Sequence, residues 1–254
     1  MKIVVPIQLV PDLVEELVVD SSGAALDRES LRWKLSEPDD HAIEQAILLK
    51  EKGGGEVVVL APDLEGVDDV LFAAAAKGAD KLIKLTGDFE GGFNEHAVAR
   101  AFLPWVKEVQ PDLVLTGVQT HNGLDGAVGA IMAEYLAVPY VGYISGVSVA
   151  GGKATLHKDY PGGLRAEIEV ALPAVLGISS AESAPRYVPI SKVRQVMKTS
   201  RIDTKDAGGL DLGGAASVKR MFPPEVAERA TMIQGSAEEV AAKLAAIMKE
   251  QGLV

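Results

Sequence analysis

The sequence predicts an α/β protein built on a doubly wound, mostly parallel sheet. Three observations predict it: short β-branched runs recur along the chain, helical patterns alternate with these runs, and Gly or Pro stands at most of the boundaries. Such alternation favours parallel strands joined by right-handed crossovers, with helices on both faces. The 254 residues suffice for one large domain, or for one domain with an appendage.

The first half of the chain supplies the repeating strands and helices. We expect a buried strand in the opening run KIVVPIQLV, residues 2–10. A helix is expected from Ser36 to Gly53, with Ser36 as its cap and Pro38 in its first turn. The alternation then continues with strands at 56–62, 81–85 and 111–117, and with helices at 67–77, 95–108 and 125–136.

Beyond Pro139 the pattern changes to short strands joined by glycine-rich turns. This part of the sheet is therefore expected to be antiparallel or mixed. The expected strands are 143–149, 153–157, 164–170 and 171–178.

From Pro185 the chain no longer resembles a compact domain. Residues 198–217 are rich in Gly and Asp, which predicts an extended arm. The arm ends in a helix that begins with a capping box of Ser236 and Glu239. Its apolar stripe needs a surface to dock on, either in its own domain or in another subunit. We therefore expect an α/β domain at 1–184 and a docking and arm region at 185–254.

Composition and charge exclude several classes of function. Asp and Glu number 36 against 25 Lys and Arg, and the net charge of −11 argues against a nucleic-acid surface. The absence of cysteine excludes disulfides, thiolate metal sites and cysteine nucleophiles, and fits a reducing compartment. The sequence has neither a run of about 18 apolar residues nor the pattern of a signal peptide, so a cytoplasmic protein is expected.

Motifs of catalysis are missing from the sequence. There is no GxGxxG after the first strand, no GxxxxGK[ST] and no GxSxG. The four histidines stand far apart and lack the spacing of metal ligands. These absences favour a binding or carrier role over an enzyme.

Ligands of open α/β sheets bind beyond the carboxyl ends of the strands. Four loops of this sequence fall there, at 6–10, 36–40, 61–64 and 117–129. The last loop is the most suggestive, because its glycines permit close backbone approach to a phosphate at the start of the next helix. An ordinary flexible connection is the alternative.

Several segments, in this order and spacing, resemble the beta subunit of electron transfer flavoproteins. The resemblance covers nearly the whole chain. The segments are VPD from Val10, HAIEQAILLKEKG from His41, AAAAKGADKLIKL from Ala73, PDLVLTGVQ from Pro111, GGL from Gly162, LPAVLGIS from Leu172, APRYVPISKVRQVMK from Ala184 and RMFPPEVAERATMIQGSAEEVAAKLAAIM from Arg220.

The resemblance implies a Rossmann-like, adenine-nucleotide-hydrolase-like fold and a non-catalytic role. Members form half of a heterodimer whose alpha subunit holds most of a redox-active FAD, and the arm embraces that subunit. Electrons arrive from acyl-CoA or other flavin dehydrogenases and leave to a quinone oxidoreductase or similar acceptor. The beta subunit itself binds AMP, or a second FAD in bifurcating members. A stand-alone nucleotide-binding protein is the alternative from another class.

The resemblance also implies which residues hold the nucleotide. They are Pro6, Ser36, Glu37, Pro38, Asp39, Pro62, Gly117, Gln119, Asn122, Gly123, Asp125, Gly126, Ala127, Val128 and Gly129. Some positions depart from the family pattern: Ser36-Glu37 replaces Asn-Pro, and Gln8 replaces a Lys. Glu37 and Asp39 would repel a phosphate if they faced it.

A docking loop is implied by the same resemblance. Pro185, Arg186 and Tyr187 match its motif, and Ile190 stands where the family has an anchoring leucine. An aliphatic side chain there can be a hot spot if it is exposed, whereas an inward-facing residue at a helix start is the alternative. Asp159 matches an acidic position that pairs with an arginine of the alpha subunit, and a plain surface carboxylate is the alternative.

Overall fold

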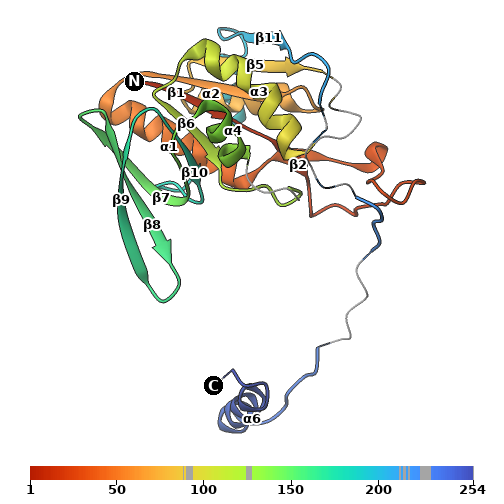
Figure 1. The fold of residues 1–254 in the computed structure, drawn as a ribbon. Coiled ribbons are helices and arrows are strands. Elements are labelled where there is room, and N and C mark those ends of the chain that lie inside the picture. The colour runs from red at the N-terminus through yellow and green to blue at the C-terminus, as the bar shows by residue number, and fades with distance from the viewer. Residues whose placement is uncertain are drawn as a thin grey trace. The chain divides into compact units, whose positions relative to one another are not determined.

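The computed structural model describes residues 1–87, 89, 94–123, 128–211, 213, 216, 218–223 and 230–253. The described chain divides into two units, Met1–Arg220 and Met221–Val254. The first unit holds the sheet and the helices that cover it (Figure 1). The second unit contains helix α6 (Ala237–Glu250).

Within the described residues, the main sheet has nine strands in the order β11-β5-β4-β1-β6-β10-β7-β8-β9. The strands from β11 to β7 are parallel to one another, and β7, β8 and β9 form an antiparallel meander. Their bounds are β1 (Lys2–Pro6), β4 (Glu56–Pro62), β5 (Lys81–Thr86), β6 (Leu113–Gly117), β7 (Tyr140–Ala150), β8 (Lys153–Tyr160), β9 (Leu164–Ala171), β10 (Ala174–Ile178) and β11 (Ile202–Asp206).

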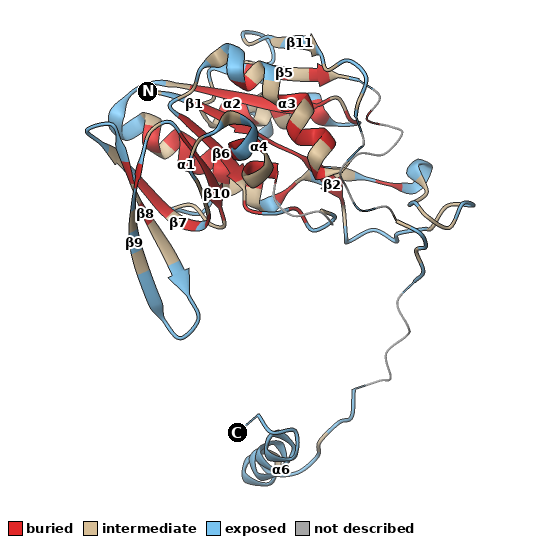
Figure 2. Ribbon diagram, in the orientation of Figure 1, coloured by how far each residue is buried: buried red, intermediate tan, exposed pale blue. Residues whose placement is uncertain are grey.

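Helices cover both faces of this sheet, as the sequence predicts. Helices α1 (Glu37–Gly53) and α2 (Val67–Lys77) contact each other on one face, and α3 (Glu95–Val109) and α4 (Val128–Leu136) contact each other on the other (Figure 1). The short helix α5 (Ile190–Val196) packs against α2. The central strands β1, β4 and β6 are buried except at one end residue each (Figure 2), because both of their faces are covered. The predicted doubly wound class is confirmed.

The strand order reverses between β1 and β6, where Ile3 pairs with Leu113 and Val4 with Val114. Strands β4 and β5, which follow β1 in the chain, extend the sheet in one direction, and β7 and β10, which follow β6, extend it in the other. This is the topological switch point, at which the loops after neighbouring strands diverge and leave room for a ligand.

The opening run does not form one continuous strand. Strand β1 ends at Pro6, and Leu9–Pro11 forms β2, which pairs antiparallel with β3 (Trp33–Leu35) in a separate sheet. The reason lies at Gln8, whose backbone N–H bonds to the Asp39 carboxylate instead of to a neighbouring strand. The prediction of a single strand over 2–10 is wrong.

Part of the expected arm belongs to the sheet. Residues 202–206 form β11, which extends the parallel sheet beside β5. Edge strand β5 offers unpaired backbone groups there, and backbone pairing needs little apolar content in the added strand. The expectation of an extended arm over 198–217 is wrong for this stretch.

Helix α6 begins with the capping box that the sequence predicts: the Ser236 hydroxyl accepts from Glu239 N–H, and the Glu239 carboxylate accepts from Ser236 N–H. The apolar side chains of Leu244, Ile247 and Met248 are exposed within the described second unit. None of the helices in the described ranges has the length and apolarity needed to cross a bilayer.

Candidate functional site

A cavity of about 510 Å³ opens at the carboxyl ends of β1 and β6, beside the switch point. It brings together the first turn of α1, the loop after β6 and the β2–β3 region. Its size lies within the range of small-molecule sites. The lining residues are Val10, Leu13, Lys34, Glu37, Pro38, Gln119, Thr120 and His121.

Asp39 lies beneath this cavity and is 3% exposed. Its Oδ2 accepts the Gln8 backbone N–H at 2.9 Å, and its Oδ1 accepts the Gly117 backbone N–H at 2.7 Å. One carboxylate from the first turn of α1 therefore joins the chain just after β1 to the last residue of β6. Asp39 faces the ends of the strands and does not line the cavity, unlike Glu37.

Burial raises the pKa of the Asp39 carboxyl to about 7, although the hydrogen bonds from Gln8 and Gly117 oppose this shift. The nearby Glu95 carboxylate adds to the upward shift of the pKa. The charge of Asp39 therefore changes close to neutral pH.

Glu95 is a second buried acid, in the first turn of α3. Its Oε2 accepts from the Gln8 side-chain amide at 3.4 Å, and its Oε1 accepts from the Thr120 hydroxyl at 3.3 Å. Gln8 therefore contacts both acids, Asp39 through its backbone and Glu95 through its side chain. Sequence reasoning missed Glu95, because an acid in a first helical turn ordinarily faces water and serves the helix dipole.

Two glycines let the loop after β6 lie against these acids. A Cβ added at Gly117 would come within 2.6 Å of Asp39 Oδ1, and one at Gly123 within 2.7 Å of Glu95 Oε1. Gly117 and Gly123 therefore allow close packing on the two buried carboxylates. The expectation that Gly123 lets the backbone approach a phosphate is not tested by this packing and stays a prediction.

The other residues implied for the nucleotide site are found at several depths. Pro6 and Pro62 are buried where β1 and β4 end. Ser36 occupies the N-cap of α1, but its side chain makes no capping hydrogen bond to the backbone and bonds to Asp39 instead. Asn122 is exposed, and Val128 and Gly129 are buried at the start of α4. Asp125, Gly126 and Ala127 lie outside the described residues.

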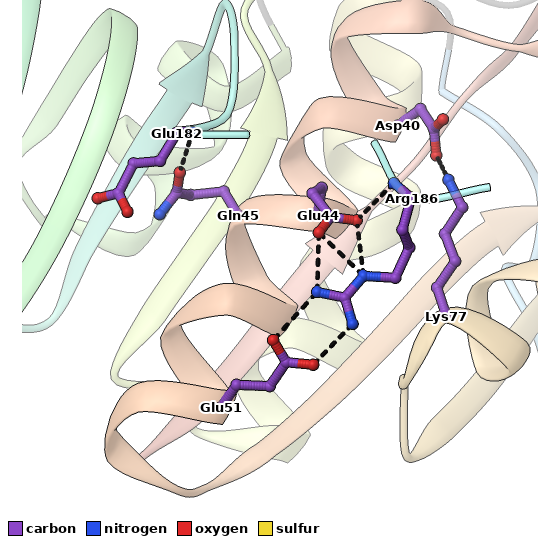
Figure 3. A network of polar contacts seen from close by, with 7 residues as sticks. All are labelled: Asp40, Glu44, Gln45, Glu51, Lys77, Glu182 and Arg186. Carbon is purple, nitrogen blue, oxygen red and sulfur yellow. Dashed lines mark hydrogen bonds and ion pairs between the residues drawn. The ribbon is translucent and has the colours of Figure 1, made fainter. Parts of the chain in front are cut away.

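The expected docking loop has one inward and two outward side chains. The Arg186 guanidinium bonds to Glu44 and Glu51 of α1 (Figure 3). Tyr187 is 86% exposed and Ile190, the first residue of α5, is 68% exposed. Ile190 therefore faces outward, as a docking residue requires.

Asp159 has a partner within this chain. Its carboxylate accepts from Arg165 Nε at 2.7 Å across the β8–β9 hairpin, and both side chains are exposed. Because this side chain is exposed, its pairing with an arginine of the alpha subunit stays a prediction.

The fold and the cavity together define a Rossmann-like α/β protein with room for a ligand at its switch point. A family model described as "Electron transfer flavoprotein domain" matches residues 24–206. The chain belongs to the electron transfer flavoprotein family, and its curated relatives carry the name of the beta subunit.

Curated relatives match the chain over nearly its full length. The protein named "Electron transfer flavoprotein subunit beta" of Methylophilus methylotrophus is 32% identical, over 98% of each chain. Proteins of the same name from Clostridium acetobutylicum and Bacillus subtilis are 29% and 26% identical, over 99% of each chain for the first and 94% and 95% for the second. The likeness thus includes the segments outside the α/β sheet.

Proposed function

We propose that this chain is the non-catalytic half of a heterodimer that carries electrons between flavin enzymes. Its companion, an alpha subunit, holds most of a FAD, which receives electrons from acyl-CoA or other flavin dehydrogenases and passes them to a quinone oxidoreductase or similar acceptor. The likeness to the Methylophilus protein over 98% of both chains carries this proposal. The lack of cysteine fits the cytoplasm as its compartment.

Region 185–254 is proposed to serve the partners of the α/β domain. Residues 185–190 supply a docking loop, and the following arm with its final helix embraces the alpha subunit. The exposed apolar face of Leu244, Ile247 and Met248 supports this assignment, because such a stripe gains stability when a neighbour covers it.

The cavity beside the switch point is proposed to hold AMP. Supporting this, the loop after β6 leads into the N-terminus of α4, where backbone N–H groups favour a phosphate. Lys34 also lines the cavity, although its ammonium group pairs with Asp12 at 2.9 Å. Among the lining residues that the structure describes, Glu37 is the one acid, and Asp39 is turned away from the cavity. Acid extraction of the purified heterodimer, followed by mass spectrometry, tests this assignment: one AMP per heterodimer supports it, and an empty extract contradicts it.

Reduction of the bound flavin tests the electron-carrier role. The heterodimer is mixed anaerobically with a purified acyl-CoA dehydrogenase and its acyl-CoA, and the flavin absorbance is followed. Bleaching that depends on the dehydrogenase supports the proposal. A flavin that stays oxidised with every dehydrogenase tried contradicts it, and a second FAD in the extract would favour the bifurcating alternative.

A further inference from the structure

A second cavity, of about 440 Å³, lies beside the carboxyl end of β6. Gln119 lines both this cavity and the one proposed for AMP, so the two cavities share part of their wall. Among the lining residues that the structure describes, Lys158 of β8 is the one charged side chain, although the whole protein has a net charge of −11. The second cavity is therefore suited to an anionic group.

The Lys158 ammonium group is held in place without a carboxylate. Its Nζ lies 5.8 Å from the centroid of the Tyr143 ring and 5.6 Å from that of the Tyr160 ring, which are cation–π distances. The neighbouring Asp159 carboxylate pairs with Arg165 at 2.7 Å. Within the described part of the chain, no acid forms an ion pair with Lys158. Its charge is therefore available to a ligand.

Tyr143 owes its direction to a bulge in β7. Gly142 pairs with Gly177 of β10, and Ile144 pairs with the next residue, Ile178, so Tyr143 is an extra residue in this ladder. Its φ of 61° lies in the left-handed region, which costs energy for a bulky side chain. Bulges re-aim side chains and are frequent beside functional sites. The fold thus accepts local strain where it places this aromatic ring in the cavity wall.

Tyr140 offers a hydroxyl donor in the same wall. A Cβ added at Gly142 or Gly177 would lie 2.6 Å from the Tyr140 Oη, so the two glycines make room for it. This hydroxyl has no hydrogen-bond partner among the described residues. Burial raises the pKa of the Tyr140 phenol, and Tyr143 adds to this shift, so the proton stays on the oxygen at neutral pH.

The Tyr140 ring also connects the second cavity with helix α4. A Cβ added at Gly129, the second residue of α4, would lie 3.2 Å from the Tyr140 Cε2. The start of this helix is where the backbone N–H groups favour a phosphate. A phosphate bound there would therefore have Tyr140 as a close neighbour.

We propose that the second cavity is an anion subsite, in which Lys158 Nζ and the Tyr140 hydroxyl bind the phosphate of the nucleotide held in the first cavity. The proposal rests on the proposed AMP site. Lys34, the cation of the first cavity, already pairs with Asp12 at 2.9 Å, so Lys158 supplies positive charge that the first cavity lacks. Lys158 is thus a specificity-determining residue that favours AMP over adenosine, and Tyr143 positions it.

Displacement of labelled AMP from the heterodimer tests this subsite. Radiolabelled AMP is loaded by exchange, and unlabelled AMP or adenosine is titrated against it, so the ratio of the two affinities reports the contribution of the phosphate. Lys158→Gln should lower the preference for AMP roughly tenfold or more and leave the affinity for adenosine within about twofold. Lys158→Arg keeps the charge and should keep most of the preference.

Two matched controls accompany these variants. Lys153→Gln removes a cation from the same strand, where it pairs with Glu169, and should leave the preference within about twofold. Tyr140→Phe removes only the proposed donor and should lower the preference roughly threefold to tenfold. Tyr143→Phe keeps the ring under Lys158 and should leave the preference unchanged.

An AMP preference that Lys158→Gln and Lys153→Gln leave equally unchanged overturns the subsite while leaving the AMP site intact. An equal loss of affinity for AMP and adenosine in Lys158→Gln overturns it too, because the phosphate would then not be the group that Lys158 recognises. A wild-type heterodimer that binds neither compound overturns the proposed AMP site, and the subsite with it.

Inorganic phosphate distinguishes a free anion from the phosphate of the nucleotide. We expect it to displace labelled AMP from the wild type at high concentration, and to do so less well from Lys158→Gln. Phosphate that raises the thermal midpoint of the wild type but not of Lys158→Gln, without displacing AMP, would show that the cavity binds a free anion, contrary to the proposal.

Discussion

The Gly117 backbone N–H donates a 2.7 Å hydrogen bond to the Asp39 carboxylate, across the point where the strand order reverses. Asp39 also binds the backbone of Gln8, so a single carboxylate connects the first turn of α1 with the chain after β1 and the end of β6. The same first turn of α1 supplies Glu37 and Pro38 to the wall of the cavity. Its pH dependence gives the first prediction.

Stability should fall as the pH rises through the titration of Asp39. Burial raises the pKa of this carboxyl from 3.8 to about 7. The folded state therefore binds the proton of Asp39 more tightly than the unfolded chain does. The free energy of unfolding should fall as the pH rises from about 4 to about 7, and the total loss above pH 7 should be about 4 kcal/mol. Asp39→Asn should lack this pH dependence. It should also lower the free energy of unfolding by about 1 kcal/mol, because the NH2 group of Asn faces one of the two backbone N–H donors and cannot accept its hydrogen bond.

Thermal midpoints of the heterodimer at pH 5 and pH 8 check this prediction. Asp39→Asn should be less stable than the wild type at pH 5 and gain on it by pH 8. A difference between the two proteins that does not vary with pH would show that Asp39 does not titrate in this range.

A side chain at Gly117 should displace the start of α1. Its Cβ would lie 2.6 Å from Asp39 Oδ1 and 2.8 Å from the Asp39 backbone nitrogen, and the backbone cannot yield cheaply. We expect Gly117→Ala to destabilise by about 1–3 kcal/mol and to lower the amount of copurified nucleotide. Gly53→Ala is the control, because nothing lies within 4 Å of its added Cβ. Equal effects of both substitutions on the thermal midpoint and the nucleotide content would refute this reasoning.

Ile190→Ala should slow electron transfer without changing the flavin. Truncating an exposed aliphatic side chain changes the free energy of unfolding little. If the side chain fills a pocket of the dehydrogenase, the truncation should weaken binding by about 1–3 kcal/mol, which raises KM roughly 5- to 150-fold. Leu164→Ala removes a similar side chain of 69% exposure on the β8–β9 hairpin and serves as the control. Steady-state kinetics with an acyl-CoA dehydrogenase measure both variants. If Ile190→Ala has the same KM as Leu164→Ala, the assignment of Ile190 as a docking residue is wrong.

Glu44 and Arg186 should be energetically coupled. Removing the guanidinium leaves a buried carboxylate without its cation, which we expect to cost about 3 kcal/mol. Adding Glu44→Gln to Arg186→Ala should restore part of the lost free energy of unfolding, which corresponds to a coupling energy of about 1–3 kcal/mol between the two side chains. Chemical denaturation of the wild type, both single variants and the double variant, at one protein concentration, gives this value. Additive losses would mean that the two side chains act independently.

Most of the fold could be predicted from the sequence because its signals are local. Buried β-branched runs such as 56–62 and the capping box of α6 depend on neighbouring residues, and both are found as expected. The break between β1 and β2 depends on Asp39, which is 31 residues from Gln8. Strand β11 depends on the free edge of β5, which lies more than 100 residues earlier in the chain.

The site could be predicted in outline only. The choice of loops follows from strand order, and the cavity lies among three of them, with Val10, Glu37 and Gln119 in its wall. The direction of each side chain does not follow from sequence. Asp39 and Arg186 both turn inward to meet partners that only the folded chain brings near.

Coexpression with the alpha subunit tests the central proposal most directly, by the size and flavin content of the purified product. We predict a single species with the mass of one copy of each chain and with one FAD per heterodimer. Two FAD molecules per heterodimer are expected only if the pair bifurcates electrons. A colourless chain that elutes alone and still turns over a metabolite would contradict it.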